Sequence, residues 1–327
     1  MRILGIQGSP RKKGNTQFLL DLFLEEARKL GATTQVIDVD KRHILPCKEY
    51  TVCEKKGFCP IDDDMKKEIY ALLREAEAVV MATPIFFYNT TAQLKALIDR
   101  CQTLWARKYK LKLIDPGQKY RKGFLLALGA TKGANLFEGV KLTAKYFFDA
   151  IGSGFNGSLT YSRIEHLGDM EKHPTVHDDV RREVRNMLSG LTGRRRILFA
   201  CKENACRSQM ASAFTQYLAG DRIEVLSAGT QPAKIPSPLM IEAMQEKGID
   251  MGFRKTRQLN EAIDSLKPEV IIIMGCGEEC PFIPGVKIQD WSLPDPAGQP
   301  INFMRQVRDE IEKRVVTLIQ QVSDGIL

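Results

Sequence analysis

Short apolar segments alternate with longer amphipathic stretches along the chain, and this pattern predicts buried strands separated by helices. The strand-like segments are residues 2–7, 33–39, 78–82 and 123–128 in the first half and residues 196–200, 225–230 and 269–274 in the second. Strands that alternate with helices form parallel sheets, because each parallel connection must cross back over the sheet. We therefore predict an α/β fold with two domains, each a parallel sheet flanked by helices.

Length and charge also divide the chain in two. A chain of 327 residues is long enough for two domains. Residues 1–193 hold 31 Lys and Arg against 23 Asp and Glu, whereas residues 194–327 hold 17 of each, so the net charge of +8 belongs to the first half. We predict a first domain at residues 1–190, a linker at residues 191–196 and a second domain at residues 197–327.

The positive charge of the first half forms neither a helix-long stripe nor a repeat, so it does not indicate nucleic-acid binding. It suits the attraction of phosphorylated cofactors instead. No stretch approaches the ~20 apolar residues of a membrane span. The N-terminus reaches Gly8 and Ser9 too early for a signal peptide. We expect a cytoplasmic protein that binds neither nucleic acid nor membranes.

Eight cysteines in such a chain favour metal or redox chemistry over structural disulfides. All four histidines precede the linker without metal-ligand spacing, and no metal site is predicted from them. Seven of the cysteines fall into three groups: Cys47, Cys53 and Cys59; Cys201 and Cys206; Cys276 and Cys280.

Residues 8–16 connect the first predicted strand to a helix and are polar and rich in glycine. Such a connection aims free backbone N–H groups at an anion. Ser9, Asn15 and Thr16 add side-chain donors, and Arg11 adds a fixed positive charge. The alternative is an ordinary strand-to-helix turn with capping residues. Residues 8–16 do not form a Walker loop, because no Gly-Lys-Ser/Thr sequence ends the segment.

A second loop, residues 83–91, follows the third predicted strand and holds three consecutive aromatic residues. At the carboxyl end of a central strand, it suits a bound planar ring. The loops and the helix after them resemble the flavodoxin-like NAD(P)H-dependent FMN reductases, including the iron–sulfur flavoprotein branch. The resemblance is carried by Gly8-Ser-Pro-Arg11, Gly14-Asn-Thr16, Thr83-Pro-Ile-Phe-Phe87 and Leu94-Lys-Ala-Leu-Ile-Asp-Arg100.

This resemblance covers most of residues 1–170 and implies a flavodoxin-like fold with FMN and NAD(P)H as cofactors. It also implies a homo-oligomer formed through the flavin domain. The FMN phosphate would contact Ser9, Arg11, Asn15, Thr16 and Gln17, and the flavin ring would lie against Pro84, Ile85, Phe86, Phe87 and Asn89.

The first cysteine group lies where the iron–sulfur branch carries a compact run of four cysteines. Here Tyr50 stands where a fourth cysteine is expected. Because a [4Fe–4S] cluster prefers four thiolates, we favour three ordinary thiols, or thiols that bind adventitious zinc, over a bound cluster.

In the second half, Cys201 and Arg207 bound a loop with the spacing C-x5-R between a predicted strand and a predicted helix. A loop of this length can wrap its amides around a tetrahedral oxyanion, with the sulfur beneath it and the guanidinium clamping two oxygens. The helix N-terminus and Arg207 favour the thiolate of Cys201. Asn204 can brace the loop, and Ser208 can donate a hydrogen bond to the sulfur. The alternative is a chance spacing.

The second half resembles the low-molecular-weight tyrosine phosphatase fold and, within it, the thiol-dependent arsenate reductases. The resemblance spans residues 194–327 and implies that Asp295, which precedes a proline, is the general acid for the leaving oxygen. It is carried by Cys201-x5-Arg207-Ser-Gln-Met-Ala211, Ser227-Ala-Gly-Thr230, Met274-Gly-Cys-Gly277 and Trp291-Ser-Leu-Pro-Asp-Pro-Ala-Gly298.

The loop alone does not separate a phosphatase from a reductase. Phosphatases of this fold usually follow the Asp-Pro pair with aromatic residues, and none follows Asp295. A reductase needs a further thiol to attack Cys201 and release arsenite. Cys276 and Cys280 lie in a glycine-flanked loop after a predicted strand and suit this role, with a structural zinc pair as the alternative.

We predict an arsenate reductase in which Cys201 attacks arsenate and Cys276 and Cys280 carry away the resulting disulfide. It is fused to an FMN-dependent NAD(P)H oxidoreductase that can supply the electrons, with thioredoxin or a small thiol as the alternative reductant. Two other functions stay open: a low-molecular-weight tyrosine phosphatase fused to a flavin reductase, and a non-catalytic sensor of oxyanions or redox state.

Overall fold

The computed structural model describes residues 1–275 and 283–327, which form two compact units. Unit 1 comprises residues 1–112 and 118–192, and unit 2 comprises residues 113–117 and 193–327. The short segment 113–117 of unit 2 pairs with residues 248–250 of the same unit through the backbone of Ile114. Its N–H donates to the Gly248 carbonyl at 2.7 Å, and its carbonyl accepts from the N–H of Asp250 at 2.8 Å.

Unit 1 is built on a parallel sheet with the strand order β2-β1-β3-β4-β5. Strands β3 and β4 are buried along nearly their whole length, as expected for central strands covered on both faces. Chain order reverses between β1 and β3, so the loops that follow these two strands diverge and leave a crevice at their carboxyl ends. The strands are β1 (Arg2–Gln7), β2 (Thr33–Asp38), β3 (Ala78–Pro84), β4 (Lys122–Gly129) and β5 (Gly154–Ser162).

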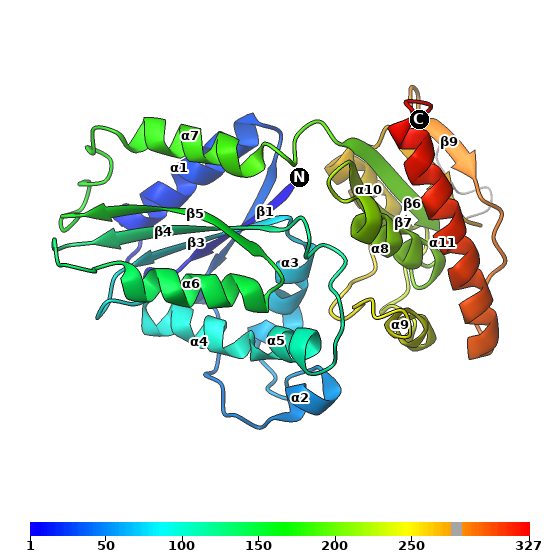
Figure 1. The fold of residues 1–327 in the computed structure, drawn as a ribbon, viewed down its shortest axis with the longest axis horizontal. Coiled ribbons are helices and arrows are strands. Elements are labelled where there is room, and N and C mark those ends of the chain that lie inside the picture. The colour runs from blue at the N-terminus through cyan, green and yellow to red at the C-terminus, as the bar shows by residue number, and fades with distance from the viewer. Residues whose placement is uncertain (276–282) are drawn as a thin grey trace. The chain divides into compact units, whose positions relative to one another are not determined.

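Helices cover both faces of this sheet (Figure 1). On one face α1 (Asn15–Lys29) and α7 (Val176–Leu188) pack against a core that includes Phe23, Phe124 and Leu126. On the other face lie α4 (Ala92–Arg100), α5 (Gln102–Tyr109) and α6 (Glu138–Ala150). The remaining elements are the short η1 (Val39–Lys41), α2 (Val52–Lys56), η2 (Met65–Ile69) and α3 (Tyr70–Glu75).

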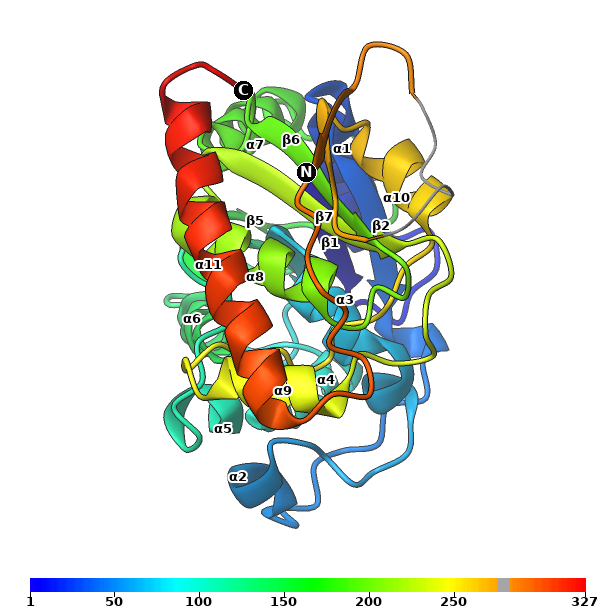
Figure 2. The ribbon, with the colours of Figure 1, turned by 90° about the vertical axis from the view of Figure 1, so that its right-hand side faces the viewer.

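Unit 2 is built on a second parallel sheet, with the order β7-β6-β8-β9. Figure 2 shows α11 running beside α8, and the core between these helices and the sheet includes Phe199, Phe214 and Met210. The elements are β6 (Arg195–Cys201), α8 (Arg207–Ala219), β7 (Ile223–Gly229), α9 (Pro238–Gln245), α10 (Leu259–Leu266), β8 (Val270–Ile273), β9 (Lys287–Asp290) and α11 (Ile301–Ser323).

The predicted fold class, two parallel sheets flanked by helices, is confirmed. Two strands that the apolar pattern did not predict complete the sheets. They are β5, which carries two glycines and several polar residues, and the four-residue β9, whose side chains are mostly exposed. Both are edge strands, where one side of the ladder is unpaired and apolar content is low.

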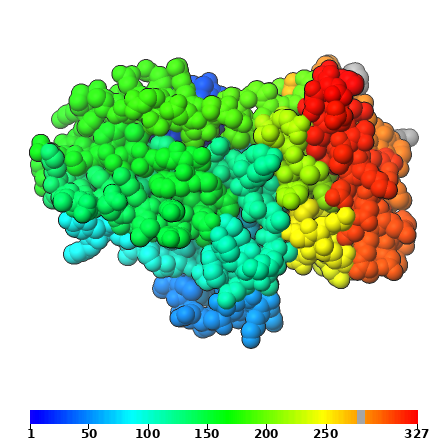
Figure 3. All heavy atoms as spheres, viewed as in Figure 1, coloured from blue at the N-terminus to red at the C-terminus, as the bar shows by residue number. Residues whose placement is uncertain are grey.

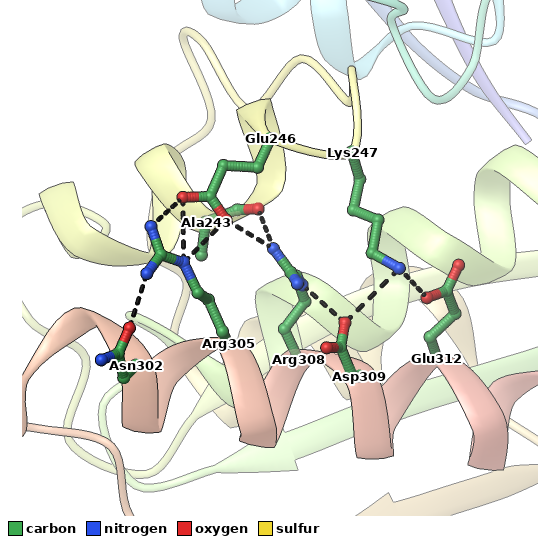
Figure 4. A network of polar contacts seen from close by, with 8 residues as sticks. All are labelled: Ala243, Glu246, Lys247, Asn302, Arg305, Arg308, Asp309 and Glu312. Carbon is green, nitrogen blue, oxygen red and sulfur yellow. Dashed lines mark hydrogen bonds and ion pairs between the residues drawn. The ribbon is translucent and has the colours of Figure 1, made fainter.

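A polar network joins α9 to α11 in unit 2 (Figure 4). The guanidinium of Arg308 donates to the carbonyl of Ala243 at 2.7 Å and to the carboxylate of Glu246 at 2.9 Å. Arg305 binds the same carboxylate, with its Nε 3.0 Å from both carboxylate oxygens. The network fixes the end of α9 against α11 and so holds the closing helix in place.

Within residues 1–275 and 283–327, no helix combines the length and the apolar character needed to cross a bilayer.

Candidate functional site

The sulfur of Cys201 lies at the end of β6, beneath the loop that leads into α8 (β6 and α8 appear in Figure 2). Cys201 is only 2% exposed, and its Sγ is 3.2 Å from the N–H of Asn204 and 3.0 Å from the hydroxyl of Ser208. Both donors and the positive N-terminus of a 13-residue helix lie next to the sulfur. The sulfur is therefore held by one backbone N–H and one hydroxyl at the start of α8, an arrangement that suits a nucleophile.

The loop keeps its shape through the side chain of Asn204, which is fully buried. Its Nδ2 donates to the Ser208 hydroxyl at 2.8 Å, and its Oδ1 accepts from the N–H of Arg257 at 2.9 Å and from Nε2 of Gln209 at 3.2 Å. Gln209 also donates to the carbonyl of Lys255 at 2.9 Å. Sequence reasoning singled out Asn204 and Ser208 but missed Gln209, because nothing in the spacing separates it from ordinary helix residues.

Arg207 lies at the first position of α8, and its side chain is 6% exposed. Its Nη1 donates to the carbonyl of Leu293 at 3.2 Å, and its Nη2 pairs with Asp295 Oδ2 at 2.9 Å. The structure thus brings Asp295, with a side chain 53% exposed, to the guanidinium that would clamp an oxyanion. An anion in the loop and the carboxylate compete for the same donor.

Cys276 and Cys280 lie within residues 276–282, outside the described residues, so their predicted role stays a prediction. The chain just before them can be placed. The N–H of Met274 donates to the carbonyl of Ala200 at 2.8 Å. A Cβ on Gly275 would stand 2.6 Å from Nη1 of Arg207. The chain therefore enters this segment directly beside the Cys201 loop.

Cys206, the other thiol of the loop, is 7% exposed. Burial raises its pKa to about 11, so near neutral pH it remains a thiol and not the thiolate that attacks a disulfide. Cys206 is therefore poorly suited to be the further thiol that attacks Cys201.

A cavity of about 590 Å³ opens at the crevice of unit 1. Its polar end is formed by the loop after β1 and the first turn of α1, and its apolar end by the loops after β3 and β4. A helix N-terminus with hydroxyls and a guanidinium suits a phosphate, and the apolar end suits a flat ring. The predicted residues in the lining are Ser9, Arg11, Asn15, Thr16, Pro84, Ile85 and Phe86, and sequence reasoning missed Lys12, Leu128, Ala130, Ile164, Glu165 and Leu167.

Three predicted flavin contacts, Gln17, Phe87 and Asn89, are not among the described residues that line this cavity. Gln17 instead accepts a hydrogen bond from the N–H of Lys13 at 2.9 Å, which braces the loop. Phe87 is fully exposed, and the side chain of Asn89 accepts from the next backbone N–H at 2.8 Å.

Asn15 lines the cavity, but its side chain holds the far rim. Its Nδ2 donates to the carbonyl of His166 at 2.7 Å, and its Oδ1 accepts from the N–H groups of Gly168 at 3.1 Å and Met170 at 3.2 Å. Three hydrogen bonds therefore tie the loop after β5 to the first turn of α1.

Cys47, Cys53 and Cys59 line a separate cavity of about 380 Å³ in unit 1, together with Tyr50. Among the described residues, no three His, Cys, Asp or Glu side chains lie close enough together to hold a metal ion. The structure brings the three cysteines to one cavity without gathering their sulfurs around a single point.

Comparisons with known proteins divide the chain in the same way. Residues 1–130 match the family model of the NADPH-dependent FMN reductases, and residues 196–325 match that of the low molecular weight phosphotyrosine protein phosphatases. An iron–sulfur flavoprotein of Methanosarcina thermophila is 32% identical over 55% of this chain and 87% of its own. A glutaredoxin arsenate reductase of Synechocystis is 34% identical over 39% of this chain and 99% of its own. Arsenate reductase 1 of Staphylococcus epidermidis is 35% identical over 38% of this chain and 96% of its own.

Proposed function

We propose how two activities work together in this chain, which belongs to two families. Its first part is a member of the NADPH-dependent FMN reductase family and is similar to iron–sulfur flavoproteins. Its second part is an arsenate reductase of the low molecular weight phosphatase family. Unit 2 reduces arsenate to arsenite through cysteine thiols. Unit 1 takes electrons from NAD(P)H and passes them to the oxidised thiols of unit 2. The two domains extend over residues 1–190 and 197–327, with residues 191–196 as the linker.

The observation that carries the first step is the sulfur of Cys201, which is held by the N–H of Asn204 and the Ser208 hydroxyl beneath the loop that leads to Arg207. The thiolate attacks arsenic and forms an S–As bond. One arsenate oxygen, protonated by Asp295, leaves as water. Asp295 can reach that oxygen because the incoming anion replaces it on Arg207, its partner in the structure.

Reduction follows at sulfur. The thiolate of Cys276 attacks Cys201, an S–S bond forms, and the S–As electron pair stays on arsenic, which leaves as arsenite in the trivalent state. Cys280 then attacks Cys276 and frees Cys201, so the Cys276–Cys280 disulfide holds the oxidising equivalents. We place both thiols in these roles because the chain enters their segment beside Arg207.

The cavity of unit 1 fits FMN. Ser9, Arg11 and Thr16 would hold the phosphate, and Pro84 and Ile85 would face the ring. When bound, FMN accepts a hydride from NAD(P)H and returns the electrons to an acceptor. The residues of this chain bind and orient the group: the N-terminus of α1 supplies N–H donors, and Asn15 holds the rim over residues 166–170.

The decisive experiment incubates the purified chain with NADPH, FMN and arsenate and measures arsenite. We expect arsenite without added thioredoxin or glutaredoxin. If arsenite forms only after one of them is added, unit 2 is an arsenate reductase but unit 1 does not supply it. The Cys276→Ser chain should release no arsenite while still being labelled at Cys201 by iodoacetamide.

If unit 2 is a phosphatase, replacement of Cys276 should have the opposite result. Rapid turnover of para-nitrophenyl phosphate that survives Cys276→Ser would show phosphoester hydrolysis, since water rather than a second thiol would then attack the intermediate. We also propose that the protein works in the cytoplasm, where NADPH and reduced thiols are maintained, and that unit 1 forms homo-oligomers.

A further inference from the structure

The cavity with three cysteines stands apart from both sites already described. Its lining is formed by residues 47–54 and 59–61 and by Asp99, Arg100, Gln102 and Thr103. It shares no residue with the flavin cavity. The segment that carries the cysteines, with α2 at its centre, projects from the edge of unit 1 (Figures 1 and 3). Cys47 is exposed and Cys53 and Cys59 are half-buried, and all three are free thiols.

The relatives named iron–sulfur flavoproteins raise the question of a cluster here. A [4Fe–4S] cluster is held by four thiolates. The lining offers three, and the phenol of Tyr50, 55% exposed, stands in the same wall. Cys101 is fully buried outside the lining, and burial raises its pKa to about 12, so it does not supply a fourth thiolate. The donor set does not fit a four-thiolate cluster.

Three soft thiolates without a fourth fit another ligand. Trivalent arsenic is soft, forms three single bonds and carries a lone pair, so three sulfurs complete its coordination. We propose that Cys47, Cys53 and Cys59 bind arsenite, the product of unit 2. The proposal rests on the proposed function only for the source of the arsenite. Binding is an exchange without redox change, in which As(OH)₃ and three thiols give three As–S bonds and three waters.

Arg100 provides an independent indication of a ligand in this cavity. It is 1% exposed and lines the cavity, and its guanidinium forms an ion pair with the buried carboxylate of Asp63. Its Nη1 also donates to the carbonyl of Leu45 at 2.8 Å. Its Nε has no hydrogen-bond partner among the described residues. A buried donor without a partner is costly, and a sulfur or oxygen of the bound ligand would satisfy it.

The same guanidinium interacts electrostatically with Cys59. Arg100 therefore adds a fixed, buried positive charge to the wall of the cavity that the three cysteines line.

Binding must draw the sulfurs together, because no three metal-binding side chains in the described part of the chain are already gathered. Cys53 lies in α2 and Cys59 follows it, whereas Cys47 lies in the exposed stretch 43–51, which has no regular secondary structure. Cys47 can move inward without breaking helix or strand hydrogen bonds, so we assign the closing movement to it.

The test measures arsenite binding directly, without arsenate and without turnover. In the full chain, Cys201, Cys206, Cys276 and Cys280 are first replaced by serine to remove the thiols of unit 2. The reduced chain is titrated with arsenite, and binding is detected by the sulfur-to-arsenic charge-transfer absorbance. The number of arsenic atoms per chain is then measured by mass spectrometry after desalting. We expect one arsenic per chain. Cys47→Ser, Cys53→Ser and Cys59→Ser should each weaken binding by at least about tenfold, because each removes one arm of a chelate.

Cys101→Ser is the matched control, a cysteine of the same unit outside the cavity, and it should bind arsenite as the parent does. Undiminished binding by the Cys47→Ser chain would overturn the proposal, as would a stable four-iron cluster formed when the parent is reconstituted with iron and sulfide. Tyr50→Cys should gain such a cluster, and its failure to take up iron would refute the argument from the missing fourth thiolate. A chain that binds arsenite but does not reduce arsenate would refute only the proposed function.

Discussion

Replacing Asn204 tests how the Cys201 loop is held in its reactive shape. Asn204 has a φ of 50°, and its side chain makes hydrogen bonds to Ser208, Gln209 and Arg257. Glycine would remove those bonds but keep the backbone unstrained, because it adopts positive φ freely. Alanine would remove the same bonds and add strain, since a left-handed conformation costs an L-residue about 1–2 kcal/mol. The two variants therefore separate hydrogen bonding from backbone conformation.

We expect Asn204→Gly to lower the free energy of unfolding of unit 2 by about 1–3 kcal/mol, the cost of leaving buried polar groups without a partner. Asn204→Ala should lower it by about 1–2 kcal/mol more. If the added strain shifts the loop toward an open, inactive conformation by the same free energy, kcat/KM for arsenate should be about tenfold lower in the alanine variant than in the glycine variant. A difference of about 1.4 kcal/mol corresponds to a factor of ten. Labelling of Cys201 by iodoacetamide should slow in the same order.

The assay follows arsenite formation and, separately, unfolding by tryptophan fluorescence. The chain has two tryptophans. Trp291 packs on Phe199 in unit 2, with ring centroids 5.5 Å apart, so a Trp105→Phe background reports unit 2 alone. Equal activity and stability of the two Asn204 variants would refute the role of the left-handed backbone. Wild-type behaviour in both would show that other contacts shape the loop.

Three further substitutions test other parts of the structure. Asp63→Asn leaves the buried Arg100 without its counter-charge and should destabilise unit 1 by about 3–5 kcal/mol, measured by denaturant unfolding. Gly229→Ala should abolish arsenate reduction, because its Cβ would stand 2.6 Å from the carbonyl oxygen of Lys202, a backbone atom that cannot turn away. Arg308→Met should lower the melting temperature of unit 2, at a cost of about 1.5–3 kcal/mol, since it removes the charged hydrogen bonds of a buried guanidinium.

Two control substitutions and one pH measurement accompany these tests. Gly190→Ala meets no atom within 4 Å and should be silent. Arg305→Met, at a more exposed position of the α9–α11 network, should destabilise unit 2 less than Arg308→Met does. Burial alone would raise the pKa of Asp63, but hydrogen bonds from Arg100 and from backbone amides lower it below its usual value. The pair therefore stabilises unit 1 above the ordinary carboxyl pKa of ~4, and this stability is lost as the pH falls through the lowered pKa. In Asp63→Asn that acid-dependent loss should vanish.

The parts that sequence predicted well are those set by local spacing. The loop from Cys201 to Arg207 follows a strand and opens a helix within seven residues, so its place between the two elements follows from local spacing. The apolar strands β1, β3, β4, β6 and β8 were found for the same reason, since full burial leaves an unbroken apolar segment in the sequence.

What the sequence did not show depends on contacts between distant segments. Residues in the range 164–167 line the cavity of unit 1 from the loop after β5, although this loop lies about 150 positions beyond the loop after β1. Asn15 reads as a phosphate ligand by its position, yet its side chain binds that distant loop. The pairing of Ile114 with residues 248–250 likewise joins segments far apart in sequence. No periodicity encodes such partners, because each depends on the complete tertiary fold.

In both units a strand, a polar loop and a helix N-terminus form a site suited to a tetrahedral anion. The two sites differ in one group, the sulfur of Cys201, which only unit 2 places there. In unit 1 the loop offers hydroxyls and a guanidinium, from Ser9, Thr16 and Arg11, which can hold an anion but cannot attack it. In unit 2 the strand ends in Cys201, whose sulfur lies beneath the loop with two donors within 3.2 Å. The arrangement proposed to hold a phosphate group in unit 1 would therefore present an anion to a nucleophile in unit 2. Cys201→Ser should accordingly leave unit 2 able to bind arsenate or phosphate while ending all reduction, because the loop amides and Arg207 remain.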